Sequence, residues 1–224
     1  MPRKYKLYYF PVRSRGEPLR YILAQSGADW QNVTVTWDDW MNKGLKQKMP
    51  FGVVPALEIN EKTLLNQTAV IGQYLAAELG LAGRDHIEAS ISFMYMHGVI
   101  DLVDAFYKAQ IPALLYMPDK FNPPEARKRF AAELKATTWK TFCDRYTGFL
   151  EKNGGKWLVG DRVSVGDLFL AEMVERVERG FDENAVQAHP LLKQHCARVH
   201  ALPGIKHYVE KIRPTFYDYS KCLF

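Results

Sequence analysis

The hydrophobic pattern of this sequence changes near residue 80. Before that point, strand-like runs (YKLYYF, VTVTW, PALEI and KTLL) alternate with helix-periodic runs (PLRYILAQSGA and TAVIGQYLAAELG). After it, helix-periodic segments follow one another without a comparable strand signal, at 86–108, 123–152, 164–180, 189–200 and 203–213. The pattern predicts a small α/β domain, built as βαβ and then ββα, followed by an all-helical domain, with the boundary near residues 80–86.

The composition excludes several classes of protein. Of the 224 residues, 47% are hydrophobic and 25% are charged, which is typical of a folded, soluble protein and unlike a disordered or fibrous one. The formal net charge of +5 is spread along the chain. The tightest basic cluster, Arg127 to Arg129, is short, so we interpret it as a solvated helix face and expect no nucleic-acid partner.

Membrane, metal and disulfide signals are all weak. The leader MPRKYK runs into a strand-like segment, and no stretch reaches the roughly 18 apolar residues of a membrane span, so we expect a cytoplasmic protein without membrane contact. The three cysteines lack CxxC spacing and are odd in number, which favours reduced thiols: Cys143, Cys196 and Cys222. No histidine pair has HExxH spacing, and we expect no metal site.

The stretch MPFGVVPALEI places Pro55 directly before a predicted strand. A cis Val54–Pro55 bond would turn the chain sharply and leave the Val54 backbone N–H and C=O free to pair with a peptide-like ligand. The alternative is an ordinary trans proline that opens the strand, and base rates favour it when the residues are taken alone.

A polar pair, Gln67 and Thr68, stands between a short strand and an amphipathic helix in LLNQTAVIGQYLA. Thr68 occupies the expected N-cap position, and the first-turn amides beyond it could bind a carboxylate. A plain N-cap explains the pair equally well.

Two acidic motifs in the helical part need no functional explanation, because ordinary structural roles account for them. Ser164 and Asp167 have the spacing of a capping box before an apolar run. Asp101 and Asp104 lie off the apolar face of the helix predicted at 86–108, and by themselves they indicate solvated charges.

The adjacent tyrosines in KLYYFPVRSRGEPLR must have different roles. Successive side chains of a strand point to opposite faces of the sheet, so Tyr8 and Tyr9 cannot both point to the same site.

Together and in this order, KLYYF, Arg15, Trp40, PFGVVP, Gln67-Thr68 and SVGD resemble the cytosolic glutathione transferases over essentially the whole chain. The resemblance is greatest to the sigma class, which includes haematopoietic prostaglandin D synthase, invertebrate and nematode enzymes, and the lens S-crystallins. It implies a thioredoxin-like domain at 1–82, an all-helical domain at 83–224 and a homodimer. It also implies a transferase that uses glutathione as cosubstrate and needs no bound cofactor.

The resemblance also assigns roles to individual residues. It implies that Tyr9 holds the glutathione sulfur and that Tyr8 is a packing residue. It implies that Val54–Pro55 is cis and that Asp101 reaches across the dimer to the γ-glutamyl amine. The remaining glutathione contacts that it implies are Arg15 and Trp40 at the cleft wall, the backbone of Val53 and Val54 at the cysteinyl part, and Gln67 and Thr68 at the γ-glutamyl end.

Two features depart from the family pattern. Thr68 stands where the family usually has serine, which keeps the hydroxyl and adds a methyl group. The segment between Trp40 and Pro50 is about two residues longer than in similar enzymes, so three lysines compete for the glycine carboxylate. Counting back from Pro50 favours Lys46 over Lys43 and Lys48.

The implied chemistry is activation of a thiol. A free thiol has a pKa of about 8.5 and is only a few per cent thiolate at pH 7. We expect the Tyr9 hydroxyl to donate a hydrogen bond to the thiolate, aided by a helix N-terminus near Glu17. The thiolate then attacks a hydrophobic electrophile, whose pocket the analogy places among Val12, Ser14, Val103, Tyr107 and the aromatic tail FYDYSKCLF.

Two other functions are compatible with the same motifs. One is a glutathione-dependent prostaglandin isomerase, and the other is a weakly active, S-crystallin-like structural or ligand-binding protein. A thiol-disulfide oxidoreductase is disfavoured because the first 82 residues contain no cysteine.

Overall fold

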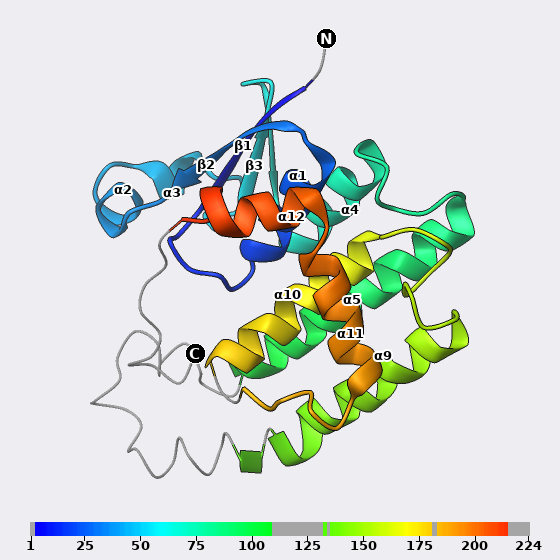
Figure 1. The fold of residues 1–224 in the computed structure, drawn as a ribbon. Coiled ribbons are helices and arrows are strands. Elements are labelled where there is room, and N and C mark those ends of the chain that lie inside the picture. The colour runs from blue at the N-terminus through cyan, green and yellow to red at the C-terminus, as the bar shows by residue number, and fades with distance from the viewer. Residues whose placement is uncertain (1–2, 109–131, 134, 181–182, 215–224) are drawn as a thin grey trace.

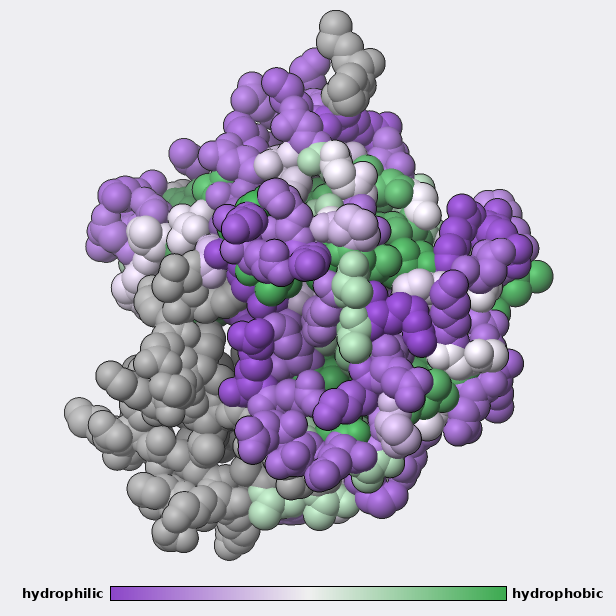
Figure 2. Space-filling view, viewed as in Figure 1, coloured by the Kyte–Doolittle hydropathy of each residue, from purple (hydrophilic) through white to green (hydrophobic). Residues whose placement is uncertain are grey.

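A computed structural model describes residues 3–108, 132–133, 135–180 and 183–214 of the chain. Figure 1 shows a sheet-containing part above a group of helices, with α1 and α12 between the sheet and the lower helices. Figure 2 shows that the face turned to the viewer is mostly hydrophilic, with small hydrophobic areas between the hydrophilic ones. None of the described helices is long and apolar enough to cross a membrane.

The first part is a four-stranded mixed sheet with helices. Its strands are β1 (Lys4–Tyr9), β2 (Asp29–Thr34), β3 (Ala56–Ile59) and β4 (Thr63–Asn66), in the spatial order β2-β1-β3-β4. β1 pairs parallel with β2 and antiparallel with β3, and β3 pairs antiparallel with β4. The helices are α1 (Glu17–Ser26), α2 (Trp37–Met41), α3 (Leu45–Lys48) and α4 (Thr68–Glu78). This order confirms the predicted βαβ and ββα units.

The rest of the described chain is helical. It contains α5 (His86–Lys108), η1 (Lys135–Trp139), α9 (Lys140–Lys152), α10 (Val165–Gly180), α11 (Pro190–His200), α12 (Pro203–His207) and η2 (Tyr208–Ile212). The predicted fold class, a thioredoxin-like α/β part followed by an all-helical part, is confirmed. The domain division at residues 82 and 83 stays a prediction, because one hydrophobic core runs from Leu7 and Leu19 through Met96 to Phe169.

The second strand was predicted too late in the chain. Residues 33–37 were expected to be a strand, but β2 ends at Thr34, and Trp37 begins α2. The reason is local, because the Thr36 hydroxyl accepts a hydrogen bond from the Asp39 N–H at 3.0 Å while the Asp39 carboxylate accepts one from the Thr36 N–H at 3.2 Å. This capping box starts a helix inside a β-rich sequence.

Of the predicted capping box, the hydrogen bond from the Ser164 N–H to the Asp167 carboxylate is present, and it is part of a larger cluster. Asp167 is fully buried, and its carboxylate accepts the Ser164 N–H and the Leu158 N–H, each at 2.8 Å. His195 Nε2 lies 2.8 Å from the same carboxylate. We call Ser164, Asp167, His195 and the Leu158 N–H the capping cluster. It joins the start of α10 to α11.

Candidate functional site

The two adjacent tyrosines lie on opposite faces of β1, as strand alternation predicted. Tyr9 is buried at 5% exposure, whereas Tyr8 is half-buried and donates its hydroxyl to Glu58 at 3.1 Å. Burial and the neighbouring Glu58 charge raise the pKa of Tyr8. The Tyr9 hydroxyl instead accepts a hydrogen bond from the Arg15 N–H at 3.2 Å. Tyr9 therefore meets the loop that leads into α1.

Gly16, which the sequence reasoning overlooked, lets α1 begin directly against the Tyr9 ring. A Cβ atom at Gly16 would lie 2.2 Å from Tyr9 Cδ1, which is too close for two atoms that are not bonded to each other. Gly16 is also the N-cap of the ten-residue helix α1. The positive end of that helix dipole thus lies next to Tyr9.

Two arginines flank Tyr9. Arg20 is fully buried, is paired with Glu17 at 3.1 Å, and holds its guanidinium carbon 5.7 Å from the centre of the Tyr9 ring. Arg15 pairs with Asp104 on α5 at 2.6 Å, both side chains being 41% exposed. Asp104 is therefore half exposed, as the solvated-charge interpretation implied, but it also has an ion-pair partner that the interpretation did not include. Periodicity and spacing rules could not have paired Arg15 with Asp104, because the two residues are 89 positions apart.

Trp40 lies almost fully buried on α2, at 8% exposure. Its ring packs edge-on against Phe10, with centroids 5.7 Å apart, in a small core that includes Val35 and Met49. Trp40 therefore fixes α2 next to the end of β1, where Tyr9 lies.

The Val54–Pro55 peptide bond is cis, as the family resemblance implied. Asn66, buried at 6% exposure, donates its amide group to the carbonyl oxygens of Val53 and Pro55, each at 3.0 Å. The Val53 carbonyl is thus already engaged, whereas the Val54 N–H and C=O have no hydrogen-bond partner among the described residues. Asn66 was missed by the sequence reasoning because a strand-terminal asparagine is not distinctive.

The Gln67-Thr68 pair forms the start of α4, shifted by one residue from the expectation. Gln67 is the N-cap, with φ of 76°, and Thr68 is the first helical residue. Thr68 is 7% exposed, and its Oγ1 is buried without a hydrogen-bond partner. A buried hydroxyl and the unpaired first-turn amides of an eleven-residue helix can together receive a carboxylate.

Lys46, one of the three candidate lysines, lies beside the cis-proline loop. A Cβ atom at Gly52 would be 3.7 Å from Lys46 Cε, so the lysine stem lies beside this turn. Lys43 is already paired with Asp38 at 2.8 Å and Asp39 at 3.1 Å. Lys46 is exposed and forms no ion pair within the part of the chain that the structure describes.

Asp101 is exposed on α5, one turn beyond His97. His97 lies 3.2 Å from Gln73 of α4, so α4 and α5 contribute to one outward face. The expected contact of Asp101 with a second subunit stays a prediction.

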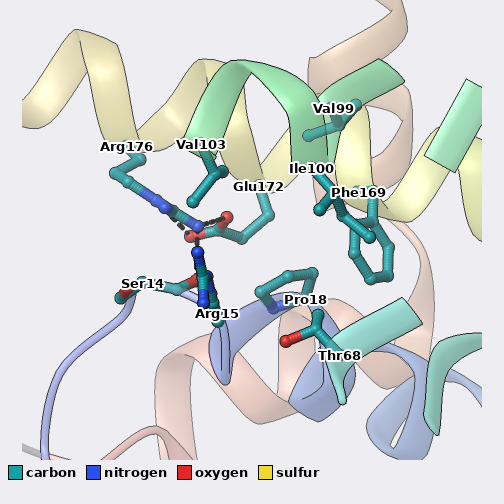
Figure 3. Close-up of a pocket in the computed structure, with 10 residues that line it drawn as sticks. All are labelled: Ser14, Arg15, Pro18, Thr68, Val99, Ile100, Val103, Phe169, Glu172 and Arg176. Atoms are coloured by element: carbon teal, nitrogen blue, oxygen red, sulfur yellow. Dashed lines mark hydrogen bonds and ion pairs between the residues drawn. The ribbon is translucent and has the colours of Figure 1, made fainter. Parts of the chain in front are cut away.

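A pocket lies where the loop before α1 meets α5 and α10 (Figure 3). Its lining includes Ser14 and Val103, two of the residues predicted at the electrophile site, and also Arg15, Thr68 and Phe169. Val12 is not among the lining residues; it is 3% exposed, and its carbonyl accepts a hydrogen bond from Arg20. The Tyr107 side chain and the tail from residue 215 lie outside the described residues.

A set of buried charges, absent from the sequence predictions, joins residues 10–16 between β1 and α1, which we call the site loop, to α10. Arg13 contacts Glu172 at 3.1 Å and Glu175 at 2.7 Å, and Arg213 contacts Glu175 at 2.9 Å. Burial acts to raise the pKa of Glu175, but hydrogen bonds from His200 and Arg213 outweigh it and lower that pKa well below its usual range. We call Arg13, Glu172, Glu175, Arg176 and Arg213 the bridging cluster.

Comparison with known proteins agrees with this architecture. Residues 3–77 match the model of the glutathione S-transferase N-terminal domain, and residues 109–212 match that of the C-terminal domain. Glutathione S-transferase A3 of Mus musculus is 33% identical over 100% of this chain and 96% of its own length.

Solved structures show the same likeness. The structure of NaGST-2 has a TM-score of 0.80 and 30% identity, covering 94% of this chain and 97% of its own. Monomeric Na-GST-3 from Necator americanus has a TM-score of 0.75 and 27% identity, covering 92% and 96%. The chain therefore belongs to the glutathione S-transferase family.

Proposed function

We propose that this protein conjugates glutathione to hydrophobic electrophiles, with the Tyr9 hydroxyl holding the glutathione sulfur as a thiolate. The observation that carries the proposal is the position of Tyr9: its buried hydroxyl meets the N-terminus of α1 and accepts the Arg15 N–H. A phenol that accepts one hydrogen bond still carries one proton to donate. We assign Tyr9 the role of hydrogen-bond donor to the thiolate and not that of a base.

The magnitudes are sufficient for this role. Lowering a thiol pKa from about 8.5 by about two units requires about 2.7 kcal/mol of differential stabilisation. A hydrogen bond from a neutral hydroxyl to a charged acceptor contributes about 1.5–3 kcal/mol, and a helix N-terminus about 0.3–1 kcal/mol. Tyr9 and α1 together can supply the whole shift.

The peptide part of glutathione is assigned to three places around Tyr9. The backbone N–H and C=O of Val54 would pair with the cysteinyl residue. The start of α4, with Gln67 and the buried Thr68 hydroxyl, would receive the γ-glutamyl carboxylate. Lys46 would pair with the glycine carboxylate, and Arg15 and Trp40 would form the wall of the cleft.

We infer a homodimer in which Asp101 completes the partner's site. Support comes from exposed apolar side chains near this face: Phe51 is 72% exposed, Val70 on α4 is 47% exposed, and Met94 on α5 is 56% exposed. Because monomeric Na-GST-3 shares the fold, sedimentation measurements on this chain must decide its assembly.

We assign the protein to the cytoplasm and to a sigma-like subclass. The subclass assignment rests on the Tyr8-Tyr9-Phe10 sequence at the end of β1. The electrophile is a small hydrophobic molecule.

The experiment is a conjugation assay with glutathione and a chloronitrobenzene acceptor. We expect conjugate formation in the wild type and a drop of about 10- to 100-fold in kcat for Tyr9→Phe at neutral pH, because one charge-directed hydrogen bond is lost. Glutathione affinity should stay within about twofold. Glutathione binding without conjugation of any acceptor in a broad panel would instead identify a ligand-binding protein.

A further inference from the structure

We propose that Arg176 of α10 is a positioning residue for Tyr9 and acts through the peptide bond between Ser14 and Arg15. The inference deepens the proposed function and rests on it. Arg176 contacts the site loop at Ser14 and Tyr9 contacts it at Arg15, and nothing in the sequence connects Arg176 with Tyr9.

The two contacts lie on the two sides of one peptide group. Arg176 Nη2 donates to the Ser14 carbonyl oxygen at 2.6 Å, as Figure 3 shows. The Arg15 N–H donates to the Tyr9 hydroxyl at 3.2 Å. In a planar trans peptide the C=O and the following N–H point in opposite directions. A fixed Ser14 carbonyl therefore orients the Arg15 N–H toward the Tyr9 hydroxyl.

Arg176 is itself held rigidly. Its side chain is 12% exposed and pairs with Glu172 one turn earlier, through Nε at 3.2 Å and also through Nη2. Glu172 is 1% exposed and also pairs with Arg13. The guanidinium thus has a defined position, and its charge is balanced locally.

The loop needs such an anchor. Ser14 has φ of 34°, a left-handed conformation that is uncommon for residues other than glycine. Such a conformation persists only where the surroundings hold it. The hydrogen bond from Arg176 to the Ser14 carbonyl helps to stabilise this conformation. The Arg176 cation also polarises the peptide group, which makes the Arg15 N–H a stronger hydrogen-bond donor.

Two other cations near Tyr9 have carboxylate partners of their own. Arg20 lies over the Tyr9 ring and is anchored by Glu17, and the Arg15 side chain pairs with Asp104. Replacing Arg176 therefore leaves these two ion pairs in place and changes the orientation of one backbone donor, the Arg15 N–H.

The test compares Arg176→Met with Arg179→Met, a matched loss of one arginine on the same helix. Arg179 is 67% exposed and pairs with Glu175, so it serves as the control. Ultraviolet absorption of the thiolate, titrated in the glutathione complex, gives the thiol pKa of each variant. We expect Arg176→Met to raise that pKa by about half a unit, as expected for one weakened hydrogen bond. At pH values below the plateau of the pH–rate profile, this shift corresponds to about a threefold loss of kcat/KM. The plateau at high pH should be preserved, and Arg176→Lys should restore part of the shift.

A second readout does not depend on the chemistry. Hydrogen exchange of the Arg15 amide, measured by NMR in the protein without glutathione, should be faster in Arg176→Met and unchanged in Arg179→Met. Wild-type exchange at Arg15 in Arg176→Met would overturn the inference, whatever the kinetics.

The same titration of Tyr9→Phe separates the two claims. If Tyr9→Phe raises the thiol pKa and Arg176→Met does not, the inference about Arg176 is wrong and the proposed function stands. If Tyr9→Phe leaves the pKa unchanged, the tyrosine mechanism is wrong, and the inference falls with it even where Arg15 exchange is faster.

Discussion

Helix α10 carries two buried polar clusters that differ in reach. The capping cluster, at its N-terminus, links Asp167 to Ser164 and Leu158 nearby in the sequence, and to His195 on the next helix. The bridging cluster, on its later turns, links Glu172 and Glu175 to Arg13, about 160 residues away, in the loop between β1 and α1. The first cluster fixes the helical domain, whereas the second fixes the site to it.

The largest effect is expected from Asp167→Ala in the capping cluster. Removing this carboxylate leaves two buried N–H groups and His195 without their partner, which should cost about 3–5 kcal/mol of unfolding free energy. Urea denaturation measures the loss. Asp161→Ala, at a side chain that is 72% exposed, should stay within about 0.5 kcal/mol. Equal losses of unfolding free energy in Asp167→Ala and Asp161→Ala would contradict a stabilising role of the capping cluster.

A smaller and pH-dependent loss is expected from Glu175→Gln in the bridging cluster. Losing charge-assisted hydrogen bonds to Arg13 and Arg213 should cost about 1.5–3 kcal/mol near pH 7. Because the pKa of Glu175 is lowered in the folded protein, its carboxylate stabilises the fold above the unfolded-state pKa of about 4.3. That contribution is lost as pH falls below this value toward the folded-state pKa.

Denaturation of wild type and Glu175→Gln at several pH values tests this claim. The difference between their unfolding free energies should be constant from pH 7 to about 5 and should shrink below about 4.3. A difference that grows on acidification would contradict the role of the Glu175 charge.

Gly16→Ala should affect both the fold and the site. The new methyl group would overlap the Tyr9 ring and must push the ring or the start of α1 aside, at a cost of about 1–3 kcal/mol. We expect about a tenfold loss of kcat/KM, because the Tyr9 hydroxyl is displaced. Gly148→Ala, where a Cβ atom meets nothing within 4 Å, is the matched control in steady-state kinetics. Full activity in Gly16→Ala would mean that the ring position is not critical.

Asp104→Asn should have the smallest effect. Its ion pair with Arg15 is 41% exposed on both sides, and such pairs contribute about 1 kcal/mol or less. We expect less than a threefold change in kcat/KM, and this change should be smaller still at high salt. A loss of more than tenfold that persists in salt would place Asp104 in the catalytic machinery.

The sequence could predict what depends on local pattern. Strand alternation separated Tyr8 from Tyr9, helical periodicity located α5 and α10, and the S-x-x-D spacing identified the cap at Ser164. The family resemblance implied the cis Val54–Pro55 bond, which base rates alone disfavoured.

What could not be predicted depends on contacts between distant residues. The partners of Arg15 and Arg176, namely Asp104 and Ser14, lie 89 and 162 positions away along the chain. Gly16 also looked unremarkable, because its requirement arises only when the Tyr9 ring packs against α1. Periodicity and propensity describe neighbours along the chain and give no information on such pairs.

The most direct test of the account is the thiol pKa of bound glutathione in wild type, Tyr9→Phe and Tyr8→Phe. Titrated by thiolate absorption, the wild-type complex should have a pKa about two units below the value of about 8.5 for a free thiol. Tyr9→Phe should return it to near that value, and Tyr8→Phe, on the opposite face of β1, should leave it as in the wild type. A pKa that is the same in wild type and Tyr9→Phe would contradict the central claim that Tyr9 holds the thiolate.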